Sequence, residues 1–360
     1  MSDEYSRQSP AHHSSLLTHH SLLPSVGVLL IQLGTPDEPT VPALRRYLRQ
    51  FLSDPRVIEA PRLLWWFILN FRILRTRPKQ STAKYQRIWT ANGSPLLHIT
   101  RLQTEALQQT LKELSVRFGM QIGNPPLAET VHELIAAGVD RLIVLPMYPQ
   151  YSAATTASAM DCLFAVFKRE RRLPAIRVVP PCYEHAAYID AVIAVIQEEL
   201  AKLSWEPEHF LLSFHGLPVK YVERGDPYPQ QVKRTTELLI DRLGWSRERW
   251  TQTFQSRFGR DEWLQPYTDK TLEELAGRGV KRVFVATPGF TTDCLETLDE
   301  IGNEARELFQ HAGGEHFHQC RCLNDHPKWI EAMRTLILQE GQGWISSLGR
   351  PVARALRFDS

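Results

Sequence analysis

A histidine that follows an apolar run is the first candidate for chemistry in this sequence. His215 ends the run Phe210–Phe214 (FLLSF), and Gly216 and Pro218 force a turn directly after it. Ligands of parallel α/β sheets lie at the carboxyl ends of the strands, so this position favours a reacting side chain. A neutral imidazole can accept a proton or bind a metal ion. The alternative is a histidine satisfied by local hydrogen bonds at a strand end.

Three glutamates at equal spacing form the second candidate. Glu296, Glu300 and Glu304 follow another apolar run, and on a helix they share one face. One interpretation is a solvated acidic surface. The other is a row of carboxylates that leads a divalent cation or protons from solvent toward a ligand cleft. Gly302 lies inside this pattern and predicts a local distortion of the helix.

The third candidate is an apolar stretch, Leu63–Leu74, which contains two tryptophans and is flanked by four arginines: Arg62, Arg72, Arg75 and Arg77. Apolar residues on every side indicate either a buried helix or an exposed lip. A lip would suit a flat, anionic, apolar ligand or a membrane surface. The most apolar part, Leu63–Phe71, is too short to span a bilayer. Further along the chain, Trp263 is either a stacking surface or a packing residue.

Eight short apolar runs are the strands that must position these residues. They are Val26–Leu33, Gly119–Ile122, Arg141–Leu145, Ile176–Val179, Phe210–Phe214, Trp250–Phe254, Arg282–Ala286 and Glu315–Gln319. Helical patterns lie between them, one of which covers Leu96–Phe118. Apolar strands that alternate with helices predict an α/β fold with parallel sheets covered on both faces. We expect two similar Rossmann-like domains, each a four-stranded parallel sheet flanked by helices, with a cleft between them.

An internal repeat supports two halves. The pattern Thr-x-x-Glu-Leu-x-x-x-Gly-Val-x-Arg starts at Thr130 and again at Thr271, 141 positions later, and Pro125 and Pro266 share that offset. A helix, a glycine and a strand recur in many α/β proteins, so chance similarity stays open. We predict an N-terminal domain over residues 25–175 and a C-terminal domain over 176–319, with a helix in 320–345 joining the first. A ligand between them is the default expectation.

Composition and missing motifs exclude several classes of function. The chain has 42 basic and 40 acidic residues, a net charge of +2, which argues against nucleic-acid binding. It lacks the glycine-rich loops that hold nucleotide phosphates. Five cysteines indicate a reducing compartment rather than a disulfide scaffold. Residues 1–24, rich in Ser and His, are predicted to be a disordered tail without a signal peptide.

Several blocks of sequence, in order, resemble the ferrochelatases, closest to the proteobacterial enzymes. They are LGTPDEPT, FLSDPRV, NGSPL, LPMYPQYS, LSFHGLP with RGDPYPQ, TFQSRFG with WLQPYTD, and PGFTTDCLETLDEI. Ferrochelatases insert Fe²⁺ into protoporphyrin IX in the last step of haem synthesis. The resemblance covers about residues 26–340. It implies two Rossmann-like domains that hold the porphyrin between them.

The resemblance also implies roles for individual residues. His215 and Glu296 match the family's active-site histidine and glutamate, which are treated as iron-site residues. Glu300 and Glu304 match the acidic ladder behind them, so all four are the expected metal-binding residues. Under this hypothesis His215 accepts pyrrole protons and binds iron, and Glu296 contacts the metal or relays protons. Expected porphyrin contacts are Leu33, Tyr85, Ser94, Trp263 and Phe290.

The sequence departs from the family pattern at two sites. Cys294 stands where many relatives have a histidine, as in some proteobacterial members. Gln121 and Ile122 replace an Arg-Tyr pair of the animal enzymes, which leaves the propionate contacts open.

No cofactor is expected beyond the substrate Fe²⁺. Ala153 matches a cysteine that binds a [2Fe-2S] cluster in some relatives, so we predict no cluster of that type. A different cluster at Cys320 and Cys322 stays open. Protoporphyrin IX and Fe²⁺ are the expected partners. The expected location is the cytoplasm, with the lip, residues 63–74, contacting the inner face of the cell membrane.

Two alternatives from other functional classes stay open. One is a related chelatase that loads cobalt or another metal into a different tetrapyrrole, such as a coproporphyrin. The other is a non-catalytic carrier of haem or metal.

Overall fold

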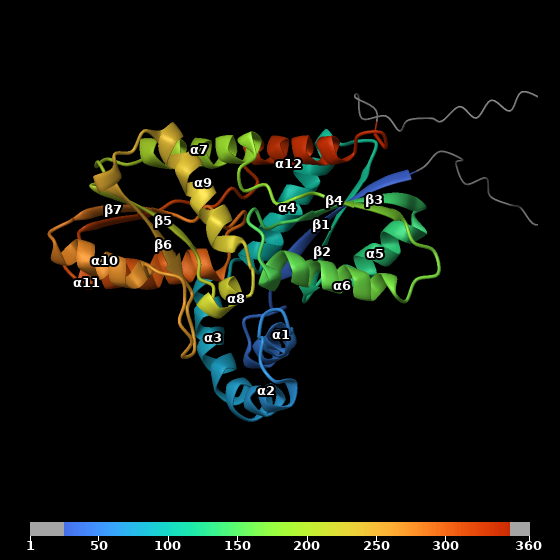
Figure 1. The fold of residues 1–360 in the computed structure, drawn as a ribbon, viewed down its shortest axis with the longest axis horizontal. Helices are drawn as coiled ribbons and strands as arrows, with labels where there is room; N and C mark the ends of the chain where they lie inside the picture. The colour runs from blue at the N-terminus through green and yellow to red at the C-terminus, as the bar shows by residue number, and fades with distance from the viewer. Residues whose placement is uncertain (1–24, 346–360) are drawn as a thin grey trace, which may run out of the picture.

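Two four-stranded, all-parallel sheets form the molecule in the computed structural model, which describes residues 25–345 (Figure 1). The first has the order β2-β1-β3-β4, with β1 (Ser25–Gly34), β2 (Ser115–Ile122), β3 (Val139–Pro146) and β4 (Ala175–Val178). The second has the order β6-β5-β7-β8, with β5 (His209–His215), β6 (Trp250–Gln255), β7 (Arg282–Ala286) and β8 (His316–Gln319). The predicted fold class and all eight strands are confirmed. The predicted tail, 1–24, lies outside the described residues.

Helices connect the strands and cover the sheets. The α-helices are α1 (Val41–Ser53), α2 (Arg62–Ile68), α3 (Leu74–Ile88), α4 (Pro95–Thr110), α5 (Leu127–Ala136), α6 (Ser158–Phe167), α7 (Ala186–Ala201), α8 (Val219–Glu223), α9 (Tyr228–Leu243), α10 (Thr268–Gly277), α11 (Arg306–His311) and α12 (Pro327–Glu340). Three segments are π-helical: η1 (Leu69–Ile73), η2 (Ala153–Ala157) and η4 (Glu296–Ala305); η3 (Arg247–Arg249) is a 3₁₀ turn.

The helix predicted over Leu96–Phe118 was wrong at its end. α4 stops at Thr110, and β2 begins at Ser115. The Gln108 amide nitrogen donates to the carbonyls of Leu111 (3.1 Å) and Leu114 (2.8 Å), and its oxygen accepts from the backbone N–H of Val116 (3.0 Å). One side chain thus satisfies the backbone of the turn, where α4 gives way to the strand.

Residues matched by the internal repeat occupy the same places in the two halves. Pro125 follows β2 and Pro266 follows β6. Each carbonyl accepts a backbone hydrogen bond of 2.8 Å from the preceding strand, from Met120 and from Phe254 respectively. Helices α5 and α10 come next, and β3 and β7 follow them. The repeat therefore corresponds to one strand–helix–strand unit used twice.

One hydrophobic core extends across both sheets. It contains buried residues of β1 and β3 together with those of β5 and β7, among them Leu30, Ile143, Leu212 and Phe284. Helix α12 packs against α7, α4 and β3, so it touches elements on either side of the predicted boundary. Figure 1 shows α7 and α12 along the same edge of the molecule. The boundary at residue 175 stays a prediction.

The apolar stretch is an exposed lip rather than a buried helix. Helices α1, α2 and α3 project from the body of the molecule (Figure 1). Leu63 is 73% exposed, Trp66 51% and Phe71 53%, and α2 contains no buried residue. Behind this surface, four buried leucines join the lip helices in a small core of their own: Leu48, Leu52, Leu69 and Leu74.

Candidate functional site

His215 is the last residue of β5, at the carboxyl edge of the second sheet, as predicted. Its Nδ1 lies 2.6 Å from the carbonyl oxygen of Gly216. A carbonyl only accepts, so Nδ1 carries a proton, and in the neutral ring Nε2 then holds the lone pair. The alternative considered from the sequence was a histidine satisfied by local hydrogen bonds. Such a hydrogen bond exists at Nδ1, but it leaves Nε2 available to accept a proton or bind a metal ion. The ring is half-buried beside Phe290, with centroids 6.4 Å apart.

The turn after His215 needs a residue without a side chain. A Cβ on Gly216 would lie 2.8 Å from the carbonyl oxygen of Gln255 and 3.1 Å from the Trp263 ring. The Trp263 ring is only 5% exposed, and its indole N–H donates to the carbonyl of Phe258 at 3.0 Å. Trp263 thus supports the loop beneath His215, which agrees with the packing alternative.

The loop after His215 is fastened to the first half of the chain. The buried Asp226 carboxylate accepts hydrogen bonds from the Ser152 hydroxyl (2.9 Å) and the backbone N–H of Ala153 (2.8 Å) at the start of η2. It also accepts from the backbone N–H of Tyr228, whose hydroxyl donates to the carbonyl of His215 at 3.0 Å. The RGDPYPQ segment therefore fixes the backbone that carries the histidine.

Glu296 begins the π-helix η4, so the predicted distortion near Gly302 extends over the whole segment Glu296–Ala305. A Cβ on Gly302 would lie 2.5 Å from the side-chain oxygen of Gln319 in β8. Gln255, at the end of β6, donates to the carbonyl of Glu296 at 2.8 Å and accepts from Ser213 in β5 at 2.8 Å. One amide therefore links the strand of His215 to the helix of Glu296.

Glu300 is bound by the residue after β6. Its carboxylate accepts from the backbone N–H of Ser256 (2.6 Å) and from the Ser256 hydroxyl (2.5 Å). Ser256 has a φ of +67°, a conformation that non-glycine residues seldom adopt and that recurs at functional sites. Burial raises the pKa of Glu300, and the charge of Glu296 adds to this, although Ser256 and His215 act in the opposite direction.

Glu304 is ion-paired with the lip helix α3. Lys84 Nζ lies 2.7 Å and Arg87 Nη2 lies 3.1 Å from its carboxylate. The same guanidinium nitrogen of Arg87 lies 2.7 Å from Asp299, whose side chain is fully buried. The acidic face is therefore neither freely solvated nor a continuous row of open ligands, because its outer end is neutralised.

Two tyrosines from the helices that flank the lip, α1 and α3, complete the surroundings of Glu296. Tyr47 of α1 and Tyr85 of α3 have ring centroids 6.3 Å apart, and Tyr85 packs with Leu44 against Leu295 and Leu298 at the start of η4. Burial raises the pKa of both hydroxyls, and the negative charge of Glu296 contributes to both increases. Tyr85 was expected here, whereas Tyr47 was missed, because its helical position gives no separate signal.

The other expected porphyrin contacts lie at the carboxyl edges of both sheets. Leu33 is half-buried at the end of β1, and Phe290 is half-buried after β7. Ser94 is only 3% exposed, and its hydroxyl lies 2.8 Å from that of Thr35. In this structure Leu33 and Phe290 expose part of their surface, while Ser94 is engaged with Thr35.

The predicted metal residues do not form a closed metal site. Within residues 25–345, no group of three or more His, Cys, Asp or Glu side chains is arranged to hold a metal ion. Glu300 and Glu304 are held by Ser256 and by the lip, which leaves His215 and Glu296 as the open pair.

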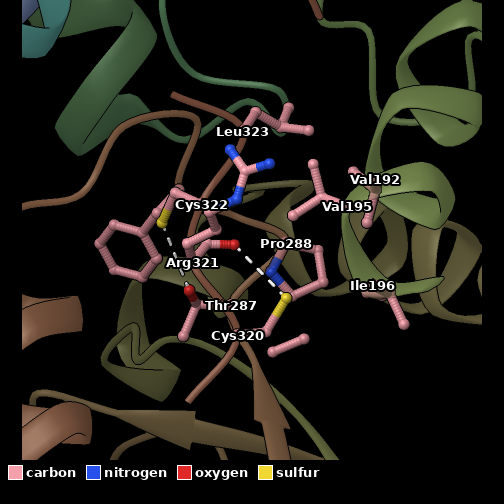
Figure 2. Close-up of a pocket in the computed structure, with 11 residues that line it drawn as sticks. Val192, Val195, Ile196, Thr287, Pro288, Cys320, Arg321, Cys322 and Leu323 are labelled. Atoms are coloured by element: carbon pink, nitrogen blue, oxygen red, sulfur yellow. Dashed lines mark hydrogen bonds between the residues drawn. The ribbon is translucent and has the colours of Figure 1, made fainter. Parts of the chain in front are cut away.

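Cys320 and Cys322 line a cavity of about 20 Å³ beside Phe290 (Figure 2). This volume holds about one water molecule, far too little for a tetrapyrrole. Figure 2 shows the two sulfur atoms apart, each with its own partner: the Cys320 thiol with the carbonyl of Arg321, and Cys322 with the Thr287 hydroxyl. Burial raises the pKa of both thiols, which disfavours the thiolate that metals bind.

Fold and site together define an α/β protein of two doubly wound halves, with a histidine and a glutamate at the carboxyl edge of one sheet and a tyrosine-lined lip against them. The sequence model of the ferrochelatase family matches residues 25–341. The chain is 50% identical to a ferrochelatase of Bradyrhizobium diazoefficiens over 325 residues, which covers 89% of this chain and 94% of that protein. The chain belongs to the ferrochelatase family, so the resemblance found in the motifs is confirmed.

Other comparisons agree. A ferrochelatase of Mesorhizobium japonicum is 49% identical over 325 residues, 89% of this chain and 92% of that protein. Among solved structures, SirB from Bacillus subtilis with Fe³⁺ superposes with a TM-score of 0.51 and 13% identity, over 88% of this chain and 98% of that one. The likeness to SirB shows that the two proteins share a fold.

Proposed function

We propose that His215 and Glu296 carry the reaction of this family, in which an enzyme inserts ferrous iron into protoporphyrin to form haem. Insertion requires the loss of two pyrrole N–H protons and the transfer of iron from its water ligands to four nitrogens. A proton acceptor and a weakly held metal contact must therefore lie on the same site. The single observation that carries the proposal is the open Nε2 of His215 beside the Glu296 segment.

His215 is the base in this proposal. Its Nδ1–H donates to the Gly216 carbonyl at 2.6 Å, so the ring keeps one tautomer and one orientation. The free Nε2 lone pair can take a pyrrole proton or contact Fe²⁺. Tyr228 and Asp226 fix the backbone beneath it, so little reorganisation is needed during the reaction.

Glu296 contacts the iron or receives its protons, and Glu300 follows it in the same path. Burial raises the pKa of Glu300, so this carboxyl binds a proton more readily than an exposed glutamate does. The path ends there in our proposal, because Lys84 and Arg87 already neutralise Glu304. Glu304 then serves the attachment of the lip rather than the passage of iron.

The porphyrin lies between the lip and the carboxyl edges of the sheets in this proposal. Leu33 and Phe290 present partly apolar surfaces toward that region, with Tyr85 buried behind the lip, and the lip arginines attract anionic propionates. The exposed lip, residues 63–74, would rest on the membrane surface at the cytoplasmic face. No helix within the described part of the chain has the length and apolarity needed to cross a membrane.

Initial rates of haem formation from Fe²⁺ and protoporphyrin IX test the assignment. We expect many turnovers for the wild type, a loss of at least 100-fold in kcat for His215→Ala, and a smaller loss for Glu296→Gln. Glu304→Gln is the matched control and should retain most of the activity. Folded variants of His215 and Glu296 with near-normal rates would refute the roles. Stoichiometric binding without turnover would instead indicate a carrier.

A further inference from the structure

A basic loop joins α6 to β4 on the surface of the first half. Four of the five residues 168–172 are cationic: Lys168, Arg169, Arg171 and Arg172. All four side chains are exposed, and none of them forms an ion pair within residues 25–345. The macrodipole of α6 favours cations at its C-terminal end, which accounts for Lys168 and Arg169. This effect falls off beyond the helix, so it gives no reason for Arg171 and Arg172.

Local contacts hold the loop in one conformation. Three backbone N–H groups, those of residues 168–170, donate to carbonyls of the last turn of α6 at 3.0, 2.9 and 3.1 Å. The acidic side chain of the run, Glu170, lies 2.7 Å from His132 Nε2 of α5, so it is engaged there. Leu173 precedes the buried Pro174, which restricts its backbone to extended conformations. A partner would therefore meet a preformed surface, at little cost in ordering.

Two exposed apolar side chains flank the basic run. Phe164 is 44% exposed and Leu173 54%, and every other large apolar side chain that is exposed within residues 25–345 belongs to the lip. Phe164 lies one turn before Lys168, so the two share a face of the helix end. An aromatic side chain among arginines is typical of protein interfaces. These six residues are the basic patch: Phe164, Lys168, Arg169, Arg171, Arg172 and Leu173.

The basic patch is separate from the lip. Figure 1 shows the loop after α6 at the right-hand end of the molecule, apart from α2. The lip exposes six large apolar side chains, whereas the basic patch exposes two among four cations. Binding to a bilayer depends on buried apolar area, which the lip supplies and the patch lacks. The charge and the small apolar area fit an acidic protein segment better than a membrane.

We propose that the basic patch docks an acidic segment of a partner protein, one in which glutamate or aspartate side chains accompany an apolar side chain. Guanidinium groups such as those of Arg171 and Arg172 pair with carboxylates through two parallel hydrogen bonds. The apolar side chain of the partner packs on Phe164 or Leu173. The patch contains none of the residues proposed for the reaction, so the partner binds without occupying the site of His215.

Fluorescence anisotropy of a labelled peptide tests this proposal on the full-length protein. The probe consists of three Glu-Glu-Leu repeats, and its neutral counterpart of three Gln-Gln-Leu repeats. We expect the wild type to bind the acidic probe about tenfold more tightly than the neutral one, and to lose this difference as salt is raised. Arg171→Glu/Arg172→Glu should raise the Kd for the acidic probe about tenfold, and Phe164→Ser/Leu173→Ser about threefold.

Arg101→Glu/Lys112→Glu is the matched control. It reverses two exposed cations at α4 that form no ion pair in the described part of the chain, and it should leave the Kd within about twofold of the wild-type value. A wild type that binds both probes equally, or equal losses in the two charge-reversal variants, contradicts the proposal. Phe164→Ser/Leu173→Ser should still sediment with phosphatidylglycerol vesicles as the wild type does. A loss of vesicle binding in that variant would assign the patch to the membrane and overturn the inference.

Discussion

The residues that hold this site together come from positions far apart in the chain. Gln255 bridges Ser213 and Glu296, and Asp226 reaches Ser152 across 74 positions. These polar groups are buried and mutually satisfied, which makes each partner costly to lose. His215 and Glu296 are thus positioned by a hydrogen-bonded support that other elements supply.

His209, a buried histidine remote from the site, contributes to the loss of folding stability at low pH. His209, at the start of β5, donates to or accepts from Thr251 at 2.8 Å, and burial lowers its pKa from 6.5 to about 4. The folded state favours the neutral ring, so its stability is complete above pH 6.5 and declines as the pH falls toward 4. Between pH 7 and pH 4 we expect the free energy of unfolding to fall by on the order of 2 kcal/mol more in the wild type than in His209→Gln.

Urea unfolding between pH 7 and pH 4 measures this difference. His311→Gln, which alters an exposed histidine, is the control and should follow the wild-type curve. Parallel curves for wild type and His209→Gln would show that the imidazole does not titrate in this range.

At the scale of elements, helix α3 is attached to η4 by three ion pairs of unequal burial, because Arg87 contacts both Asp299 and Glu304. Arg87 meets Asp299, whose carboxylate is fully buried, whereas Lys84 meets Glu304, which is 39% exposed. Removal of Arg87 leaves a buried charge whose remaining side-chain partner is the Asn303 amide. We expect Arg87→Met to lower the free energy of unfolding by about 3 kcal/mol, and Lys84→Met by less than about 1 kcal/mol.

Equilibrium unfolding followed by circular dichroism distinguishes the two pairs. The double variant Arg87→Met/Asp299→Asn should recover at least half of the loss, because it removes the unpaired charge. Equal effects of Arg87→Met and Lys84→Met would contradict the distinction by burial.

The elements could be predicted from the sequence wherever a local pattern decides them. Apolar runs such as Phe210–Phe214 have one stable place, inside a covered parallel sheet, and the turn at Gly216 ends that strand at His215. Gly302 likewise signalled a distorted helix. The extent of η4 could not be foreseen, because its winding depends on contacts such as Gln255 and Gln319, which other strands supply.

Pairings across long sequence separations could not be predicted either. Arg87 and Asp299 are 212 positions apart, and the local sequence around either residue does not identify the other as its partner. The lip was ambiguous for a related reason: a helix that is apolar on every side is consistent with burial or with exposure. Only the packing of the other elements decides between them.

At the scale of the molecule, the lip is the largest exposed apolar surface among the described residues, with basic side chains around it. Arg75 lies over the Phe71 ring at 5.4 Å. Apolar burial and attraction to anionic lipids act together on such a surface. We expect the protein to sediment with vesicles rich in phosphatidylglycerol, and Phe67→Ser/Phe71→Ser to reduce the bound fraction several-fold.

Two controls define that experiment. Leu173→Ser removes another exposed apolar side chain, 54% exposed and outside the lip, and should bind as the wild type does. Vesicles of phosphatidylcholine alone should bind less protein. Equal binding by the lip variant and the wild type would place membrane contact elsewhere or exclude it.

The continuous core has a consequence for how a large, flat substrate enters. Separation of the two halves as rigid bodies would expose buried side chains of β1, β3, β5 and β7 at once, a cost comparable to unfolding. The lip and the helices that flank it, in contrast, rest on a separate core of four leucines and on three ion pairs from α3. We therefore expect a large substrate to enter by opening of the lip helices, at low cost, against a body that stays closed.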